Sequence, residues 1–309
     1  MTLFRGLSAF PITPTDDAGH VQADALCAIL ERIAAAGADS VGLLGSTGAY
    51  AYLARGERRR AVEAAVACLG GRTPVVVGVG ALRTDEAAAL ARDAEAAGAD
   101  GLLLAPVSYA PLTEAEVRAH VLAVAGATGL PLCLYNNPAT TRFTFGEGLI
   151  AELARTPVVA AVKMPLPGDG DVAGEVGRLR ATAPKGFVVG YSGDWGAADA
   201  LLAGADAWFS VVGGLLPGPA LRLARAAQRG DATEAGRVDA AFGPLWALFR
   251  ELGSFRVAYA LAEALALGRF EPLRPVLPIG PEARARLDEA LDAIAALPDA
   301  GVGGLREAP

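Results

Sequence analysis

The sequence is poor in histidine and lysine, and almost all its basic residues are arginine. Only two histidines occur among 309 residues, His20 and His120, and they lie far apart. A zinc site built on histidines is therefore disfavoured, and we predict that the protein holds no metal. Only two lysines occur, Lys163 and Lys185, against 25 arginines. Because lysine is rare in this chain, we ask of each of the two whether it has a functional role.

Cysteine is also scarce, apolar runs are short, and the net charge is negative. Cys27, Cys68 and Cys133 are widely spaced in apolar stretches, which predicts reduced thiols in a cytoplasmic protein. No run reaches the roughly 18 apolar residues of a membrane span, and prolines at 11 and 14 interrupt the N-terminal stretch, which does not read as a signal peptide. The net charge of −7 argues against a nucleic-acid partner. We therefore predict no membrane and no nucleic acid among the partners.

Short apolar runs alternate with amphipathic stretches through the first two thirds of the chain. Gly-Ala-Asp precedes three of these runs, and glycine suits the turn that ends a helix. Strands buried on both faces read as continuous apolar runs, so we interpret eight of them as parallel strands. They are 7–11, 40–44, 74–78, 101–104, 131–135, 158–163, 187–190 and 207–211. Eight strand–helix repeats predict a closed (β/α)₈ TIM barrel, with an open doubly wound sheet as the alternative.

The remaining segments have helical periodicity. Those between the predicted strands are 23–36, 55–69, 84–97, 113–128, 145–154, 172–183 and 195–203, and those after the last strand are 217–229, 233–252, 255–267 and 281–297. We predict a catalytic barrel over 1–225 and a C-terminal helical extension over 226–309 that packs on it. The last residues, 301–309, are expected to fray.

Lys163 ends the sixth predicted strand, in the apolar segment VVAAVKMPLP. In barrels of this kind the active site forms where the strands end. Burial disfavours the ammonium form, and a neutral lysine amine is a nucleophile toward carbonyl carbon, with which it forms a Schiff base. The structural alternative is a lysine whose head extends to water from the end of a strand. The rarity of lysine in this chain favours the functional interpretation.

Polar residues follow two other predicted strands. Tyr135 ends the fifth strand, next to the sixth, so its hydroxyl is expected near the Lys163 amine, where a phenol could shuttle a proton. After the second strand come Gly45, Ser46, Thr47 and Gly48, whose backbone N–H groups and hydroxyls could hold a carboxylate. The alternatives are a tyrosine that only fills the barrel mouth and a plain strand-to-helix turn.

Other patterns fail or are weak. Gly78-Val79-Gly80 begins like a dinucleotide fingerprint, but Arg83 stands at its third glycine position, so no organic cofactor is predicted. Asp169-Gly170-Asp171 lacks the other ligands of a calcium loop. Gly213-Gly214 could hold a phosphate but fits a tight turn better.

These motifs together resemble the dihydrodipicolinate synthase and N-acetylneuraminate lyase family of class I (Schiff-base) aldolases. The resemblance runs from AFPITPTD at 9–16 to LRPVLPIG at 273–280, with landmarks GSTGAYAYL at 45–53, GLLLAPVSY at 101–109, YNNP at 135–138, AVK at 161–163 and SGD at 192–194. It implies a (β/α)₈ barrel with a C-terminal helical extension, assembled as a homotetramer or homodimer.

The resemblance also implies residue roles. Lys163 would form the Schiff base with pyruvate or another 2-oxo acid, Tyr135 would transfer protons, and Ser46 and Thr47 would hold the carboxylate. We expect Lys163, Tyr135 and Thr47 to be catalytic. The residues expected to bind substrate are Gly45, Ser46, Gly48, Ser108, Tyr109, Thr140 and Val211, where Ser108 or Tyr109 occupies the place of a tyrosine that the family supplies across a subunit interface.

The sequence departs from the family at positions that bear on the second substrate. Ala49 stands where the family often has glutamate, and Thr140 stands where the synthases carry an arginine, with Arg142 two positions on. These departures favour a Schiff-base aldolase or dehydratase of unassigned substrate. The alternatives are 4-hydroxy-tetrahydrodipicolinate synthase proper, a metal- or phosphate-dependent barrel enzyme, and a non-catalytic barrel that binds a 2-oxo acid.

Overall fold

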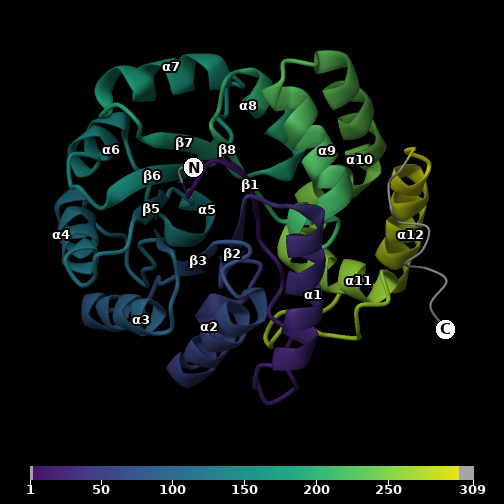
Figure 1. Ribbon diagram of the computed structural model, residues 1–309, viewed down its shortest axis with the longest axis horizontal. Helices are drawn as coiled ribbons and strands as arrows, with labels where there is room; N and C mark the ends of the chain where they lie inside the picture. Colours follow the sequence, from purple (N-terminus) through teal and green to yellow (C-terminus); the bar gives the residue numbers. More distant parts are fainter. Residues whose placement is uncertain (1–2, 299–309) are drawn as a thin grey trace.

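Eight parallel strands close into a barrel in sequence order, as the computed structural model of residues 3–298 shows (Figure 1). They are β1 (Gly6–Ala9), β2 (Ser40–Leu43), β3 (Val75–Gly78), β4 (Gly101–Leu104), β5 (Leu132–Tyr135), β6 (Val159–Met164), β7 (Val188–Tyr191) and β8 (Ala207–Ser210). Closure by pairing of β1 with β8 excludes the open doubly wound sheet. The predicted barrel is confirmed, with strand ends displaced by no more than two residues.

The helices surround the strands, with α5 seen over the barrel and α12 at the outer edge of the molecule (Figure 1). They are α1 (Ala23–Ala36), α2 (Arg55–Leu69), α3 (Thr84–Ala96), α4 (Glu114–Ala125), α5 (Pro138–Thr141), α6 (Glu147–Leu153), α7 (Val172–Thr182), α8 (Ala197–Leu202), α9 (Pro217–Gln228), α10 (Ala232–Leu252), α11 (Ser254–Ala264) and α12 (Pro281–Ala295). Short 3₁₀ turns are η1 (Tyr50–Tyr52), η2 (Asp194–Gly196) and η3 (Val212–Gly214). The short α5 and the 3₁₀ turns were not predicted, because segments of three or four residues carry no helical periodicity.

The four predicted C-terminal helices are present as α9 to α12, and the last of them ends at Ala295. Helix α10 packs against both α9 and α12, and α11 packs against α10. The predicted boundary between residues 225 and 226 falls inside α9, and the predicted fraying at 301–309 lies outside the described residues. The division into a barrel and an extension stays a prediction.

Aromatic side chains fill the interior of the barrel. Phe10, Phe209 and Tyr135 belong to an inner buried cluster that also contains Cys133, a free thiol. The ring of Phe10 lies where a side chain on β2 would otherwise point, since a Cβ on Gly42 would come within 2.1 Å of it. The glycine in β2 therefore makes room for an aromatic ring at the centre of the barrel.

The three Gly-Ala-Asp segments tie neighbouring strands together where the strands begin. Each glycine adopts a positive φ, 84° at Gly37, as a helix terminus requires. The aspartate that follows exchanges two hydrogen bonds with the preceding strand: the Leu7 N–H donates to the Asp39 carboxylate at 2.7 Å, and the Asp39 N–H donates to the Leu7 carbonyl at 3.0 Å. Asp100 and Asp206 make the same pair of bonds with Val75 and Val189. We call these three reciprocal pairs the aspartate clamps.

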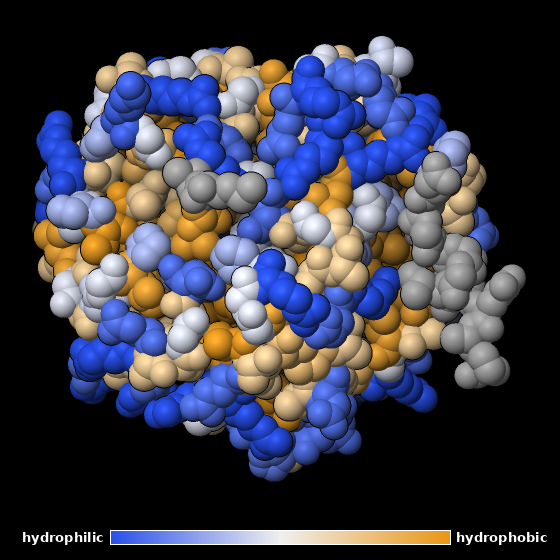
Figure 2. Space-filling model, viewed as in Figure 1, coloured by the Kyte–Doolittle hydropathy of each residue, from blue (hydrophilic) through white to orange (hydrophobic). Residues whose placement is uncertain are grey.

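Hydrophilic residues cover much of the outer helices, with apolar residues showing between them (Figure 2). Among residues 3–298, no helix combines the length and apolar character that crossing a bilayer demands.

Candidate active site

Lys163 lies inside the barrel near the end of β6 and is 4% exposed. Its neighbours in the sheet are Tyr135 on β5 and Gly190 on β7. Its amine Nζ lies 4.1 Å from the centre of the Phe10 ring and 4.2 Å from that of Tyr135. The ring faces offer electrostatic attraction to a cation but cannot accept strong hydrogen bonds as carboxylates do. Lys163 is thus a buried amine among aromatic rings at the carboxyl end of a parallel strand.

The Tyr135 hydroxyl is held by polar groups from two loops. The side-chain amide of Asn137 donates to the Tyr135 Oη at 3.1 Å, and the Ser46 Oγ lies 3.5 Å from it, at the limit of a hydrogen bond. Tyr135 and Lys163 are adjacent in the sheet, as the winding order predicted. The Tyr135 hydroxyl therefore has polar contacts with two loops, while the Lys163 amine lies against the ring of the same side chain.

The loop after β2 brings Ser46 and Thr47 to the same place. The Thr13 hydroxyl donates to the Gly48 carbonyl at 2.8 Å, which ties this loop to the segment after β1. Thr47 is buried and Ser46 is half-buried. Gly45 packs against the Phe10 ring, where a Cβ would come within 2.5 Å of it. The glycines of this loop therefore allow close packing around the hydroxyl groups.

A cavity of about 350 Å³ opens above Lys163. It brings together six of the predicted residues, Ser46, Thr47, Tyr135, Thr140, Lys163 and Val211. The other four do not line it. Gly45 and Gly48 belong to the loop behind Ser46 and Thr47. The Ser108 hydroxyl donates to the Thr141 carbonyl at 3.2 Å, and Tyr109 is 92% exposed.

Several lining residues were not among the sequence predictions. They are Phe10, Asn137, Ala139, Ser192, Gly193, Asp194, Trp195, Phe209, Phe249, Gly253, Ser254 and Phe255. Those at strand ends, such as Phe10 and Asn137, could have been found from the rule that barrel sites form there. Phe249 and Phe255 come from α10 and α11, and no signal in the sequence indicates that these helices reach the barrel mouth.

Asp194 is a buried carboxylate beside this cavity. It accepts hydrogen bonds from the Trp208 indole at 2.9 Å and from the Val212 N–H at 2.7 Å, with a longer one from Val211 at 3.2 Å. Burial raises the pKa of Asp194 to about 6, although these donors and the charge of Lys163 oppose the rise. Its contacts fix the turn after β8, including Val211 in the cavity wall.

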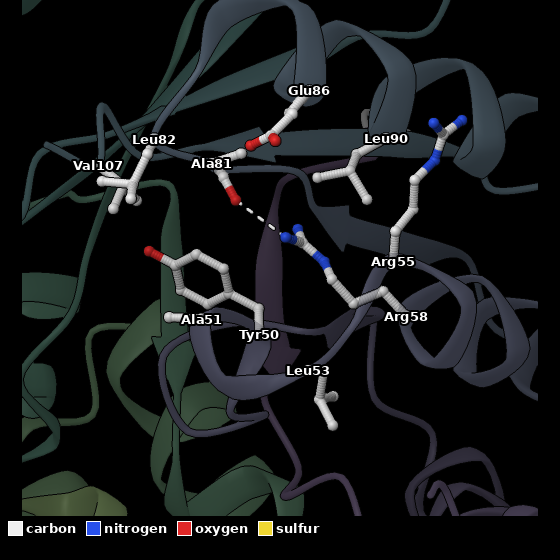
Figure 3. A pocket seen from close by; sticks show the side chains of 11 residues that line it. Tyr50, Ala51, Leu53, Arg55, Arg58, Ala81, Leu82, Glu86, Leu90 and Val107 are labelled. Carbon is white, nitrogen blue, oxygen red and sulfur yellow. Dashed lines mark hydrogen bonds between the residues drawn. The ribbon is translucent and has the colours of Figure 1, made fainter. Parts of the chain in front are cut away.

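A second cavity, of about 400 Å³, lies beside the loop after β3 and shares no lining residue with the first (Figure 3). The buried guanidinium of Arg58 enters it and donates to the carbonyls of Gly78 at 2.8 Å and Gly80 at 3.0 Å. Burial lowers the pKa of Arg58 to about 10 and raises that of the neighbouring Tyr50. Neither Lys163 nor Tyr135 lines this second cavity, so a Schiff base at Lys163 would form in the first.

Among residues 3–298, no group of three or more His, Cys, Asp or Glu side chains is arranged to bind a metal ion.

A buried lysine at the carboxyl end of β6, beside a tyrosine on β5 in a closed eight-stranded barrel, defines the class of lysine-dependent (class I) aldolase-type lyases. The profile of the Dihydrodipicolinate synthetase family matches residues 3–294. The chain belongs to this family.

Named relatives agree with this assignment. The 4-hydroxy-tetrahydrodipicolinate synthase of Salinibacter ruber is 37% identical over 226 residues, which is 72% of this chain and 73% of the relative. That of Neisseria meningitidis serogroup B is 30% identical over 297 residues, 94% of this chain and 99% of the relative. The crystal structure of dihydrodipicolinate synthase from Agrobacterium tumefaciens is 62% identical, with a TM-score of 0.93 over 94% of this chain and 98% of that one. The chain is a Schiff-base-forming lyase of this family.

Proposed function

We propose that Lys163 attacks the keto carbon of pyruvate, or of a related 2-oxo acid, and forms the Schiff base through which a carbon–carbon or carbon–oxygen bond is then made or broken. The observation that carries this proposal is the buried Lys163 amine, 4.2 Å from the Tyr135 ring in one cavity with two hydroxyl side chains. The amine is the nucleophile of this step, and it lies in the cavity beside the hydroxyl groups that would hold the acid.

The neighbouring side chains supply the other steps. Tyr135 transfers protons to and from the carbinolamine oxygen, with Ser46 at 3.5 Å as the next group in line. Ser46 and Thr47 hold the substrate carboxylate, and Gly45 and Gly48 shape their loop. Val211 and Thr140 contact the rest of the substrate. Ser108 or Tyr109 takes the place of the family's cross-subunit tyrosine.

Reductive trapping tests the Schiff base directly. Borohydride with pyruvate should add one adduct at Lys163 and none at Lys185, which is exposed in the turn before β7. Peptide mapping by mass spectrometry locates the adduct, and Lys163→Ala should abolish it. An adduct at Lys185, or none with any of a panel of 2-oxo acids, contradicts the mechanism. No added metal or organic cofactor should be needed, so exhaustive chelation should leave trapping unchanged.

A second candidate function is 4-hydroxy-tetrahydrodipicolinate synthase itself, which the names of the relatives favour. Thr140 speaks against it, because a neutral hydroxyl cannot replace the charge-assisted, two-pronged contact of an arginine with a carboxylate. Condensation of pyruvate with aspartate semialdehyde should therefore be slow. A synthase rate that saturates at low concentrations of both substrates would favour the second candidate.

We further propose a homotetramer or homodimer that works in the cytoplasm. The 92% exposed Tyr109 and the exposed Leu82 are large apolar side chains that an interface would cover. All three cysteines are free, which suits a reducing compartment. Light scattering after size exclusion should give two or four times 31.3 kDa, and a mass of one chain contradicts the proposed assembly.

A further inference from the structure

The cavity above Lys163 has an aromatic wall, made of three rings other than those that lie against the lysine amine. Trp195 in η2, Phe249 in α10 and Phe255 in α11 line it, together with small side chains such as Ala139 and Ser254. A three-carbon acid bound to Lys163 fills only a small part of about 350 Å³. The space that remains is large enough for the other half of a larger substrate.

Phe255 is held in place by other rings. It stacks on Tyr52 with ring centres 6.0 Å apart and planes 4° from parallel, and Tyr259 meets it edge-on at 5.3 Å. A ring held by two neighbouring rings loses little freedom when a ligand packs against it, so it is a preformed contact surface.

Trp195 presents a large apolar side chain partly to solvent. It is 39% exposed although it lines the cavity. Gly193, with φ near 91°, lies under its ring, where a Cβ would come 3.5 Å from the indole Cζ2. A ligand that covers this ring removes apolar surface from water, which favours binding.

The wall carries no positive charge. The charged side chains that line the cavity are Lys163 and Asp194, and the first is committed to the Schiff base. Arg142 is exposed and does not line the cavity, and Thr140 contributes only a hydroxyl. An anionic group in this part of the cavity would give up contacts with water without gaining a cation among the lining residues.

We propose that the part of the substrate beyond the 2-oxo acid is uncharged and apolar, with a flat, aromatic body that packs on Trp195 and Phe255. This inference rests on the proposed Schiff base at Lys163. In the direction of synthesis, the pyruvate imine loses a proton from its methyl carbon and becomes an enamine. That carbon forms a bond to the carbonyl carbon of an uncharged aldehyde while the aldehyde π bond breaks. The aldehyde oxygen takes a proton, and water then hydrolyses the imine, releasing a 4-hydroxy-2-oxo acid and the Lys163 amine.

Two 2-oxo acids that differ in the group farthest from the keto carbon test the proposal. The test does not depend on the direction in which the enzyme works. The two acids are 4-phenyl-2-oxobutanoate, which ends in a phenyl ring, and 2-oxoglutarate, which ends in a carboxylate. The concentration that gives half-maximal borohydride trapping at Lys163 is measured for each, with pyruvate as the reference. The phenyl acid should need at least about tenfold less than 2-oxoglutarate, since aromatic contact and the absence of a partner for the carboxylate act together. In the aldol reaction with pyruvate, benzaldehyde should likewise surpass glyoxylate.

Variants distinguish the contribution of the aromatic wall from that of Lys163. Trp195→Ala and Phe255→Ala should raise the half-maximal concentration of the phenyl acid about fivefold or more and leave that of pyruvate within about twofold. Leu122→Ala, which removes an exposed apolar side chain on α4, is the matched control and should change neither. Thr140→Arg should shift the preference toward 2-oxoglutarate.

Equal or better trapping of 2-oxoglutarate by the wild-type protein overturns this inference. So does a loss in Trp195→Ala and Phe255→Ala that is the same for pyruvate as for the phenyl acid. Trp195→Leu and Phe255→Leu repeat the measurement should the alanine variants fail to fold, and the wild-type comparison needs no variant. If pyruvate is trapped but the phenyl acid is not preferred, only this inference falls. If no 2-oxo acid is trapped at Lys163, the proposed function falls with it.

Discussion

At the scale of single residues, the Tyr135 hydroxyl can be removed without disturbing the packing around it. Tyr135→Phe keeps the ring that lies against Lys163 and loses only the contacts with Asn137 and Ser46. We expect turnover to fall by about 10²–10⁴-fold, the usual contribution of general acid–base catalysis, while the thermal midpoint hardly moves. Stopped-flow rates of imine formation and steady-state turnover measure the effect. Turnover at the wild-type rate would make Tyr135 a packing residue.

Asp194 gives the stability of the protein a predictable dependence on pH. Its pKa in the folded protein is about 6, against an ordinary value of 3.8, so between these values the folded state binds more protons than the unfolded state. Its contribution to the free energy of unfolding therefore falls as pH rises from about 4 to about 6, by up to about 3 kcal/mol. Asp194→Asn should flatten this part of the profile.

Urea unfolding at closely spaced pH values between 4 and 7 checks this expectation. Asp17→Asn, at an exposed aspartate, is the control and should leave the profile as it is in the wild type. A profile for Asp194→Asn that still falls as steeply between pH 4 and 6 would contradict the assignment of this slope to Asp194.

At the scale of elements, β2 shapes the site through Gly42, whose lack of a side chain leaves room for the Phe10 ring. A methyl group on Gly42 would come within 2.1 Å of the Phe10 ring, and Phe10 lies 4.1 Å from the Lys163 amine. Gly42→Ala should therefore displace Phe10, cost about 1–3 kcal/mol of stability and slow imine formation. Gly56→Ala in α2, where a Cβ meets open space, should instead be neutral or stabilise by up to about 1 kcal/mol. Chemical unfolding and trapping rates of the two variants make the comparison.

The strands and the adjacency of Tyr135 and Lys163 were predictable because they depend on local sequence and winding order. The apolar runs at 101–104 and 131–135 match β4 and β5 within one residue, and Tyr135 lies beside Lys163 because consecutive strands in such a barrel are neighbours. Phe249 and Phe255 were not predictable, since their place at the barrel mouth depends on how α10 and α11 pack. The role predicted for Tyr109 across a subunit interface stays a prediction, since a residue with that role would be exposed in a single chain, as Tyr109 is.

At the scale of the whole molecule, the C-terminal helices are joined to the barrel through an apolar interface. In α10, the side chains of Phe242, Trp246 and Phe249 are buried. The ring centre of Trp246 lies 4.8 Å from that of Phe242 and 5.7 Å from that of Phe249. We expect a single calorimetric unfolding transition and equally slow amide exchange in α9 and α10, because neither can open without exposing the other. Earlier melting or faster exchange of α10–α12 would show that they form a separate cooperative unit.

The aspartate clamps lie at the end of the barrel opposite to the proposed reacting groups. They join β1 with β2, β3 with β4, and β7 with β8 at the amino ends of the strands, whereas β5 and β6 have no such aspartate and pair with a shift in register between Leu132 and Cys133. Tyr135 and Lys163 lie at the carboxyl ends of β5 and β6. Substitutions around the reacting groups therefore leave the clamps untouched. Related proteins with this barrel can therefore change substrate through single substitutions near the cavity, while the bonds that hold the strands together stay the same.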